Sequence, residues 1–375
     1  MARRVFVHVG LPKTGTSYLQ SVFWPQRDRL RELGLLVPGR ERRDHLLSSL
    51  IVREDDNVHR RGPGAAEAWQ VVTAETAAHP GTALISHEFF CSASTEQFRR
   101  MVADLAPAEV HVVITAREPL GLFTSSWQES LKNRATAPLA DYSRRESDDP
   151  RVTWNWRALD LGLVLERLRP VLPDERVHVI VSPGPGDPRD ELWRRFATVI
   201  GIDPDAVDVA DAFPNASMGV VEAELLRRVN AHLGSFQTAQ ERARWIRTVL
   251  ADRLLVTPDA ERFWPGEDRV EDARRRGDRA ADLLAAGGYD VLGDPARLRV
   301  PAELPPRRRP DEVTEAELLE ASVRLNAQLL GELRGRARSE APGTPTADDA
   351  DASRRTAGLR SRLRALAGGR RPGRA

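Results

Sequence analysis

The segment that most constrains the fold is a short apolar run followed by a glycine-bounded loop and an amphipathic stretch. The run over residues 5–9 predicts a buried strand, and a helix is expected to begin at Gly15 or Thr16. A helix N-terminus presents unpaired N–H groups, and the helix dipole favours negative charge there. The loop adds an ammonium group and several hydroxyl groups, from Lys13, Thr14, Thr16 and Ser17. We therefore expect a binding site for a phosphate-type group.

The order of residues in this loop differs from that of a Walker A loop, G-x-x-x-x-G-K-[ST]. Gly10 and Gly15 have the Walker A separation, but Lys13 precedes the second glycine instead of following it. No aspartate at the end of a following apolar strand offers an obvious magnesium ligand. An ordinary turn between a strand and a helix remains the alternative, because short motifs also occur by chance.

A second strand is predicted over residues 110–116, which are almost all apolar and rich in β-branched side chains. Arg117 follows this strand, and the apolar spacing predicts a helix over about 119–133. Ligands bind at the carboxyl ends of strands in open α/β sheets, and an arginine can hold a phosphate with two parallel hydrogen bonds. Ser125 lies two turns into the helix. Arg117 is thus a phosphate-binding candidate, with a surface ion pair as its alternative role.

Together the two motifs resemble those of the sulfotransferases that use 3′-phosphoadenosine-5′-phosphosulfate (PAPS). In that family P-K-T-G-T-[ST] binds the 5′-phosphosulfate, and an arginine at a strand end, with a serine eight residues later, binds the 3′-phosphate. Residues 12–17, Arg117 and Ser125 match these motifs. The resemblance to sulfotransferase-like proteins of high-GC bacteria covers most of residues 1–300. A later glycine-rich motif of the family is absent, and Asn215 or Ser217 is the replacement that we expect for its contact.

The strand predicted over residues 82–86 ends in His87 and Glu88, which are the candidates for a catalytic base. Transfer of a sulfuryl group to an alcohol needs a base near the acceptor oxygen. The resemblance implies a glutamate here in carbohydrate sulfotransferases and a histidine in the cytosolic branch. Adjacent residues of an extended segment point to opposite faces, so only one should face the donor, and the branch favours Glu88. Alternatively, Glu88 caps a turn or pairs with an arginine, and His87 packs at the strand end.

The alternation of strands and helices predicts an α/β fold with three layers, similar to P-loop proteins, in which helices cover both sides of a central parallel sheet. A further strand is expected over residues 176–182 and a helix over 154–169. The later part of the chain reads as mostly helical. The expected division is a sulfotransferase-like domain over 1–300 with a helical subdomain at about 220–286, a linker and an amphipathic helix over 301–338, and a disordered basic tail over 339–375.

Composition limits the classes of function. The chain has 56 Lys plus Arg against 55 Asp plus Glu, which argues against a general nucleic-acid-binding protein. Cys91 is the single cysteine, so no intrachain disulfide framework exists and a reducing compartment is favoured. No stretch approaches the ~20 apolar residues of a membrane span, and we expect a cytoplasmic protein. The tail should be solvated, with weak contact to an anionic membrane surface as its alternative.

The resemblance therefore implies an enzyme that transfers a sulfuryl group from PAPS to a hydroxyl or amine of an unidentified acceptor, which could be a small molecule, a glycan or a lipid. Residues 13–17, Gly15 included, would hold the 5′-phosphosulfate, and Lys13 would also stabilise the leaving phosphate oxygen. No metal is expected. The alternatives are a P-loop kinase or NTPase, which would need Mg²⁺, and a non-catalytic relative that binds a nucleotide.

Overall fold

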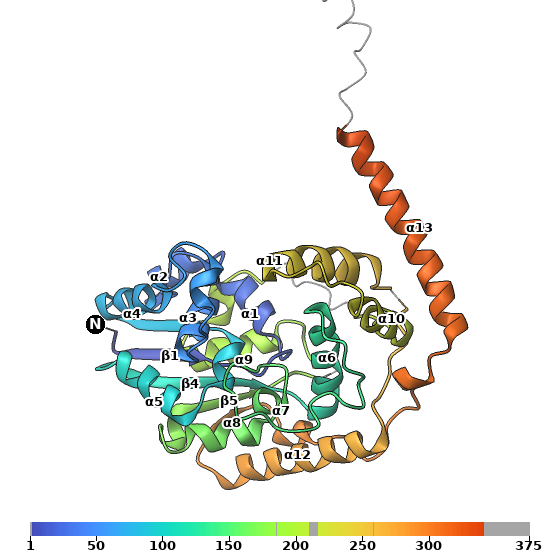
Figure 1. Cartoon of the computed structure of the whole chain (residues 1–375). Coiled ribbons are helices and arrows are strands. Elements are labelled where there is room, and N and C mark those ends of the chain that lie inside the picture. Colours follow the sequence, from blue (N-terminus) through green and yellow to red (C-terminus); the bar gives the residue numbers. More distant parts are fainter. Residues whose placement is uncertain (1, 185, 210–216, 258, 341–375) are drawn as a thin grey trace, which may run out of the picture. The chain divides into compact units, whose positions relative to one another are not determined.

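The computed structural model describes residues 2–184, 186–209, 217–257 and 259–340. Its centre is a sheet of six parallel strands in the order β2-β3-β1-β4-β5-β6 (Figure 1). The strands are β1 (Arg4–His8), β2 (Leu35–Leu36), β3 (Thr82–Ser86), β4 (Glu109–Ala116), β5 (Val177–Val181) and β6 (Asp290–Leu292). The predicted α/β class with a central parallel sheet is confirmed.

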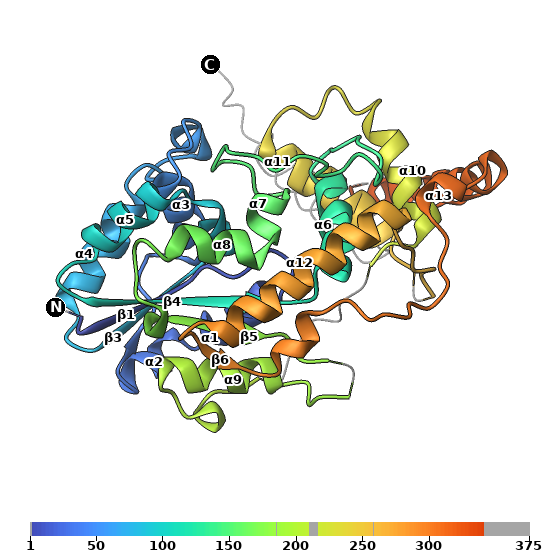
Figure 2. The same ribbon diagram turned by 90° about the horizontal axis from the view of Figure 1, so that it is seen from below.

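Helices cover both faces of this sheet. Figure 2 shows α1, α2 and α9 on one side of the sheet and α4, α5 and α8 on the other. The helices of the sheet region are α1 (Thr16–Phe23), α2 (Arg27–Glu32), α3 (Arg42–Val52), α4 (Ala68–Ala78), α5 (Thr95–Asp104), α6 (Pro119–Lys132), α7 (Trp156–Leu159), α8 (Leu161–Leu168) and α9 (Glu191–Ile200). The helix expected over 154–169 is therefore two helices, which meet at Asp160, whose side chain caps α8.

One apolar layer lies between the sheet and helices α1 and α9. It takes one buried residue from each of the four central strands, namely Phe6, Leu84, Val113 and Ile180. Aromatic side chains of the helices fill the space above them, and the rings of Phe23 and Phe196 stack with their centroids 6.4 Å apart. Strands that are buried on both faces carry near-continuous apolar runs, which is why these strands were readable in the sequence.

The order of the strands determines where loops gather. The chain passes from β1 outward to β2, returns to β3 and then crosses to β4 on the other side of β1. β1 therefore lies between β3 and β4, and the carboxyl ends of these three parallel strands meet at one edge. In open α/β sheets such a change of direction opens a crevice at the carboxyl edge, where ligands bind.

The region expected to be mostly helical contains α10 (Val220–Asn230), α11 (Ala239–Glu241), the π-helix η5 (Arg242–Leu254) and α12 (Glu267–Ala286). The following proline-rich stretch, expected as a linker, packs on this part. Val300 and Leu304 contact the apolar cluster that includes Leu120, and the guanidinium of Arg307 lies 3.8 Å from the centre of a ring of Trp264. The compact unit that begins at the N-terminus accordingly extends to Ala321.

The second compact unit begins at Ser322, inside helix α13 (Glu315–Glu340), and an amphipathic helix was expected within residues 301–338. Thr314 and Glu317 form a capping box, with the N–H of Thr314 donating to Glu317 Oε2 at 2.8 Å. A disordered basic tail was expected over residues 339–375, but residues 339 and 340 belong to α13, and residues 341–375 lie outside the described residues. Within the part that the structure describes, no helix has the length and apolar character needed to cross a membrane.

A row of polar side chains crosses strands β4, β5 and β6. His111 Nε2 lies 2.9 Å from Glu109 Oε1, and His111 Nδ1 lies 2.8 Å from His178 Nε2. His178 Nδ1 lies 2.6 Å from Asp290 Oδ2. Burial lowers the pKa of His111 below its usual value. These contacts tie the short strand β6, which the sequence analysis did not predict, to its neighbours.

Candidate functional site

The loop that joins β1 to α1 has an unusual backbone. Gly10, Lys13 and Gly15 all have positive φ, of 43°, 69° and 97°. Lys13 is notable because side chains other than glycine rarely adopt this conformation, and such strain is often found at functional sites. Backbone hydrogen bonds of 2.9 Å, from the N–H of Val9 to the carbonyl of Val113 and from Leu11 to Thr115, hold the loop against β4. The expected strand, loop and helix are all present, and the helix begins at Thr16.

A chain of buried hydrogen bonds connects this loop to residues of strands β1, β3 and β4. The Thr14 hydroxyl donates to the Leu11 carbonyl at 2.6 Å and lies 2.6 Å from the hydroxyl of Thr115, which must then donate to it. His8 continues the chain, with Nε2 3.2 Å from the Thr115 hydroxyl and Nδ1 2.8 Å from that of Ser86. Burial, aided by His87, lowers the pKa of His8 to about 3, so the ring is neutral. Thr14 thus shapes the loop from inside.

The other two hydroxyl groups of the predicted loop motif belong to Thr16 and Ser17. Thr16 is 3 % exposed, and its Oγ1 is buried without a hydrogen-bond partner among the described residues. Such orphaned buried groups are uncommon, and a bound ligand is one explanation. Ser17 is exposed, and no side chain caps α1 at Gly15, so the N–H groups of its first turn remain available. These features fit an anion with several oxygen atoms.

The ammonium group of Lys13 is held at the mouth of the loop by Glu129 from α6. Lys13 Nζ lies 3.0 Å from Glu129 Oε2, and Arg247 from η5 contacts the other carboxylate oxygen. The Glu129 side chain is only 8 % exposed. Burial disfavours its charge, but the surrounding cations outweigh burial and lower its pKa to about 2. The sequence analysis did not identify Glu129 or Arg247 as residues of the site. The one signal that it offered was for Glu129, an acidic residue within a largely buried helix.

His87 and Glu88 follow the end of β3 and differ in their freedom to accept a proton. His87 Nδ1 accepts a hydrogen bond of 3.1 Å from the N–H of Phe89, which caps the short helix η2 (Glu88–Ser92). Burial and nearby arginines lower the pKa of His87 to about 3. Its neutral ring therefore carries hydrogen on Nε2, and neither nitrogen has a free lone pair that could take a proton from an acceptor molecule.

Burial has the opposite effect on the neighbouring carboxyl. It raises the pKa of Glu88, although the charges of Arg42 and Lys13 oppose part of that rise. Glu88 also interacts electrostatically with Glu129, so it belongs to the same group of charges as the loop lysine. The side chain is 19 % exposed and can be reached from solvent. Its raised pKa makes Glu88 a stronger base than an ordinary glutamate.

Arg117 stands at the carboxyl end of β4, beside the loop. Its guanidinium is 40 % exposed, with Nε 3.7 Å from Glu118 Oε1, too far for a normal hydrogen bond. Glu118 in turn caps α6, since both its carboxylate oxygens lie 2.9 Å from the N–H of Gly121. Ser125 is half-buried on the same helix and has no hydrogen-bond partner among the described residues. Arg117 and Ser125 can both bind an anion.

Asn215 or Ser217 was expected to replace the contact of the absent glycine-rich motif, and only Ser217 can be located. Asn215 lies outside the described residues. Ser217 is exposed and precedes Met218, whose backbone is held against α6 by Gln128 through contacts of 3.2 and 3.3 Å. Ser217 therefore lies close to the helix that carries Ser125. Among the residues that the structure describes, no cluster of three or more histidine, cysteine or acidic side chains could hold a metal ion.

Comparison with known proteins gives little further information. No family model and no curated protein sequence matches the chain. A sulfotransferase from Alicyclobacillus acidocaldarius matches with a TM-score of 0.40 and 18 % identity over 57 % of this chain and 88 % of the other. The sulfotransferase domain from the curacin biosynthetic pathway matches with a TM-score of 0.33 and 9 % identity over 57 % of this chain and 79 % of the other. Similarity at this level assigns no role to any residue, so the residues must be judged by their own geometry.

The buried hydrogen-bond chain can be tested with the isosteric change Thr115→Val. It removes the hydroxyl between His8 and Thr14, so His8 Nε2 loses its partner and Thr14 keeps only its bond to the Leu11 carbonyl. We expect a loss of roughly 1–3 kcal/mol in the free energy of unfolding, measured by urea denaturation.

Thr124→Val is the matched control for this variant, because the buried hydroxyl of Thr124 bonds only to carbonyls of its own helix. Its loss should be clearly smaller. Equal losses for the two variants would contradict a supporting role for the chain.

Proposed function

We propose that the protein is a sulfotransferase that uses PAPS as its donor. One observation carries the proposal. The carboxyl end of β1 leads to Lys13 and the uncapped N-terminus of α1, and the carboxyl end of the adjacent strand β4 leads to Arg117. A single nucleotide with anionic groups at both its 5′ and 3′ positions would use both of these cationic sites. The motif order of the loop supports the same donor.

In the proposed complex the loop holds the 5′-phosphosulfate. The N–H groups of the first turn of α1 and the hydroxyls of Thr16 and Ser17 donate to its oxygens. Lys13 exchanges its contact with Glu129 for the oxygen that bridges phosphorus and sulfur. Arg117 and Ser125 hold the 3′-phosphate, with Ser217 or Asn215 as an additional contact. These assignments account for the unpartnered hydroxyls of Thr16 and Ser125.

The transfer step follows from this arrangement. The acceptor oxygen, or nitrogen, attacks the sulfur atom, and the bond between sulfur and the bridging oxygen breaks. The electron pair of that bond stays on the phosphate of the product, 3′-phosphoadenosine-5′-phosphate (PAP), where Lys13 and the helix dipole stabilise the developing charge. The proton of the acceptor passes to Glu88. The raised pKa of Glu88 and the occupied Nδ1 of His87 support Glu88 as the base.

Nucleotide preference tests the donor. We expect PAP to raise the melting temperature without added metal, and ADP to raise it much less, because ADP lacks the 3′-phosphate that Arg117 and Ser125 would bind. A thermal-shift panel with PAP, ADP and ATP, each with and without Mg²⁺, measures this. Equal effects of PAP and ADP, or stabilisation by ATP only with Mg²⁺, would favour a kinase or NTPase instead.

Lys13→Ala tests the role of the loop lysine. A charged donor aimed at the leaving oxygen contributes about 10²-fold or more to the rate. We expect release of PAP from PAPS to slow by that factor while the melting temperature of the free protein changes little. Lys132→Ala is the matched control, because Lys132 is the only other lysine in the sequence and pairs with Asp252. Similar rates for both variants would show that Lys13 has no special function.

Glu88→Gln and His87→Asn separate the two candidate bases. With Glu88 as the base, Glu88→Gln should bind PAP normally and transfer the sulfuryl group about 10²–10⁴ times more slowly. His87→Asn should cost much less, because asparagine can still cap η2. The readout is transfer of labelled sulfate to an acceptor that the unaltered protein uses. The reverse ranking would assign the base to His87, and loss of PAP binding in Glu88→Gln would make Glu88 a structural residue.

A further inference from the structure

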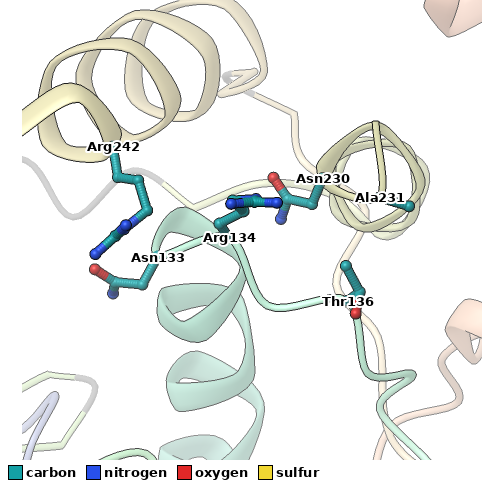
Figure 3. A pocket seen from close by; sticks show the side chains of 6 residues that line it. All are labelled: Asn133, Arg134, Thr136, Asn230, Ala231 and Arg242. Atoms are coloured by element: carbon teal, nitrogen blue, oxygen red, sulfur yellow. The ribbon is translucent and has the colours of Figure 1, made fainter. Parts of the chain in front are cut away.

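A polar pocket of about 570 Å³ opens beside the carboxyl end of α6, between that helix, α10 and η5 (Figure 3). Its lining consists of five polar residues and one alanine: Asn133, Arg134, Thr136, Asn230, Ala231 and Arg242. Among the residues that the structure describes, none of those lining the pocket is acidic, and both charged ones are arginines. A pocket of this composition is suited to a polar anion and poorly suited to a phenol, a steroid or a lipid chain.

Neither guanidinium forms an ion pair with a carboxylate among the described residues, although the neighbouring Glu241 interacts electrostatically with Arg242. The guanidinium of Arg134 has no hydrogen-bond or ion-pair partner within the described part of the chain, and that of Arg242 donates to the backbone carbonyl of Gln237 at 2.5 Å. Arg134 also has a positive φ of 73°, a conformation that costs energy for a residue other than glycine. Both side chains can donate several hydrogen bonds to an anion.

Asn230 supplies an independent indication of a ligand. Its side chain is 1 % exposed, and its amide nitrogen donates to the carbonyls of Leu131 and Ala135, both at 2.8 Å. The amide oxygen is buried and has no partner among the described residues. Figure 3 shows this side chain extending from α10 toward Arg134. A buried acceptor of this kind requires a donor, which a hydroxyl group of a bound molecule would provide.

The pocket is connected to the proposed donor site by two helices. Asn133 lies one turn after Glu129, about 6 Å farther along α6, and its amide donates to the Glu129 carbonyl at 2.9 Å. Glu129 is the residue that holds Lys13. On η5, Arg247 contacts Glu129 and Arg242 lines the pocket. The pocket therefore lies about one helical turn from the residue that holds the loop lysine.

We propose that this pocket binds the acceptor, and that the acceptor is a hydroxyl-rich compound with an anionic group, either a carboxylate or a sulfate. The inference rests on the proposed function for the role of the molecule as acceptor. The arginines bind the anionic group, Asn230 accepts a hydrogen bond from a hydroxyl, and another hydroxyl reaches the donor. A charged monosaccharide is a simple probe with this combination of groups.

The test compares D-glucuronate, D-glucose 6-sulfate and D-glucose, titrated into the protein with PAP present and followed by calorimetry. At least one charged sugar should bind about tenfold or more tightly than glucose, because each arginine adds a charge-assisted hydrogen bond. The charged sugar that binds more tightly identifies the anion. If neither charged sugar binds more tightly than glucose, the proposal is wrong.

Variants locate the binding site. The double variant Arg134→Asn with Arg242→Gln should lose about tenfold or more in affinity for the charged sugar, and asparagine tolerates the positive φ at position 134. Arg31→Gln is the matched control, since Arg31 is exposed on α2 and has no side-chain partner among the described residues. Unchanged affinity in the double variant would overturn the proposal. Titration with PAP alone tests the donor separately, so failure there would count against the proposed function and leave the sugar site standing.

Discussion

The rest of the site depends on the two hydrogen bonds made by the neutral ring of His8. The ring bonds on one side to Ser86 at the end of β3 and on the other to Thr115 at the end of β4. The hydroxyl of Thr115 then supports Thr14, so the loop takes its shape from two neighbouring strands. The same strand ends lead directly to the candidate base and to Arg117. One buried histidine therefore links the loop after β1 to the strand ends that precede His87 and Arg117.

The sequence allowed the parts of the fold with strong local signals to be predicted. The strand over residues 82–86 and the start of α1 agree with the structure, because apolar runs and the glycine-bounded loop determine them locally. The strand β6 was missed because three partly exposed residues form no apolar pattern. The packing of residues 300–310 was missed because prolines and arginines are typical of a linker, whereas here an arginine stacks on Trp264.

Within the loop, the sequence could name the polar side chains but could not separate their roles. The structure divides the three hydroxyls: Thr14 is committed to the interior, whereas Thr16 and Ser17 remain available. The contacts of Glu129 with Lys13 and Arg247 join segments far apart in the chain, so no local pattern could reveal them. They bear on the proposed function, because in it a lysine that is already paired exchanges one anion for another.

The row of polar side chains across β4, β5 and β6 has a consequence for proton content. Its three short contacts each need a hydrogen between their two atoms, whereas two neutral imidazole rings supply only two. The third must be an additional proton. The three side-chain hydrogen bonds at the far edge of the sheet can therefore all form at once only when the two rings together carry this additional proton.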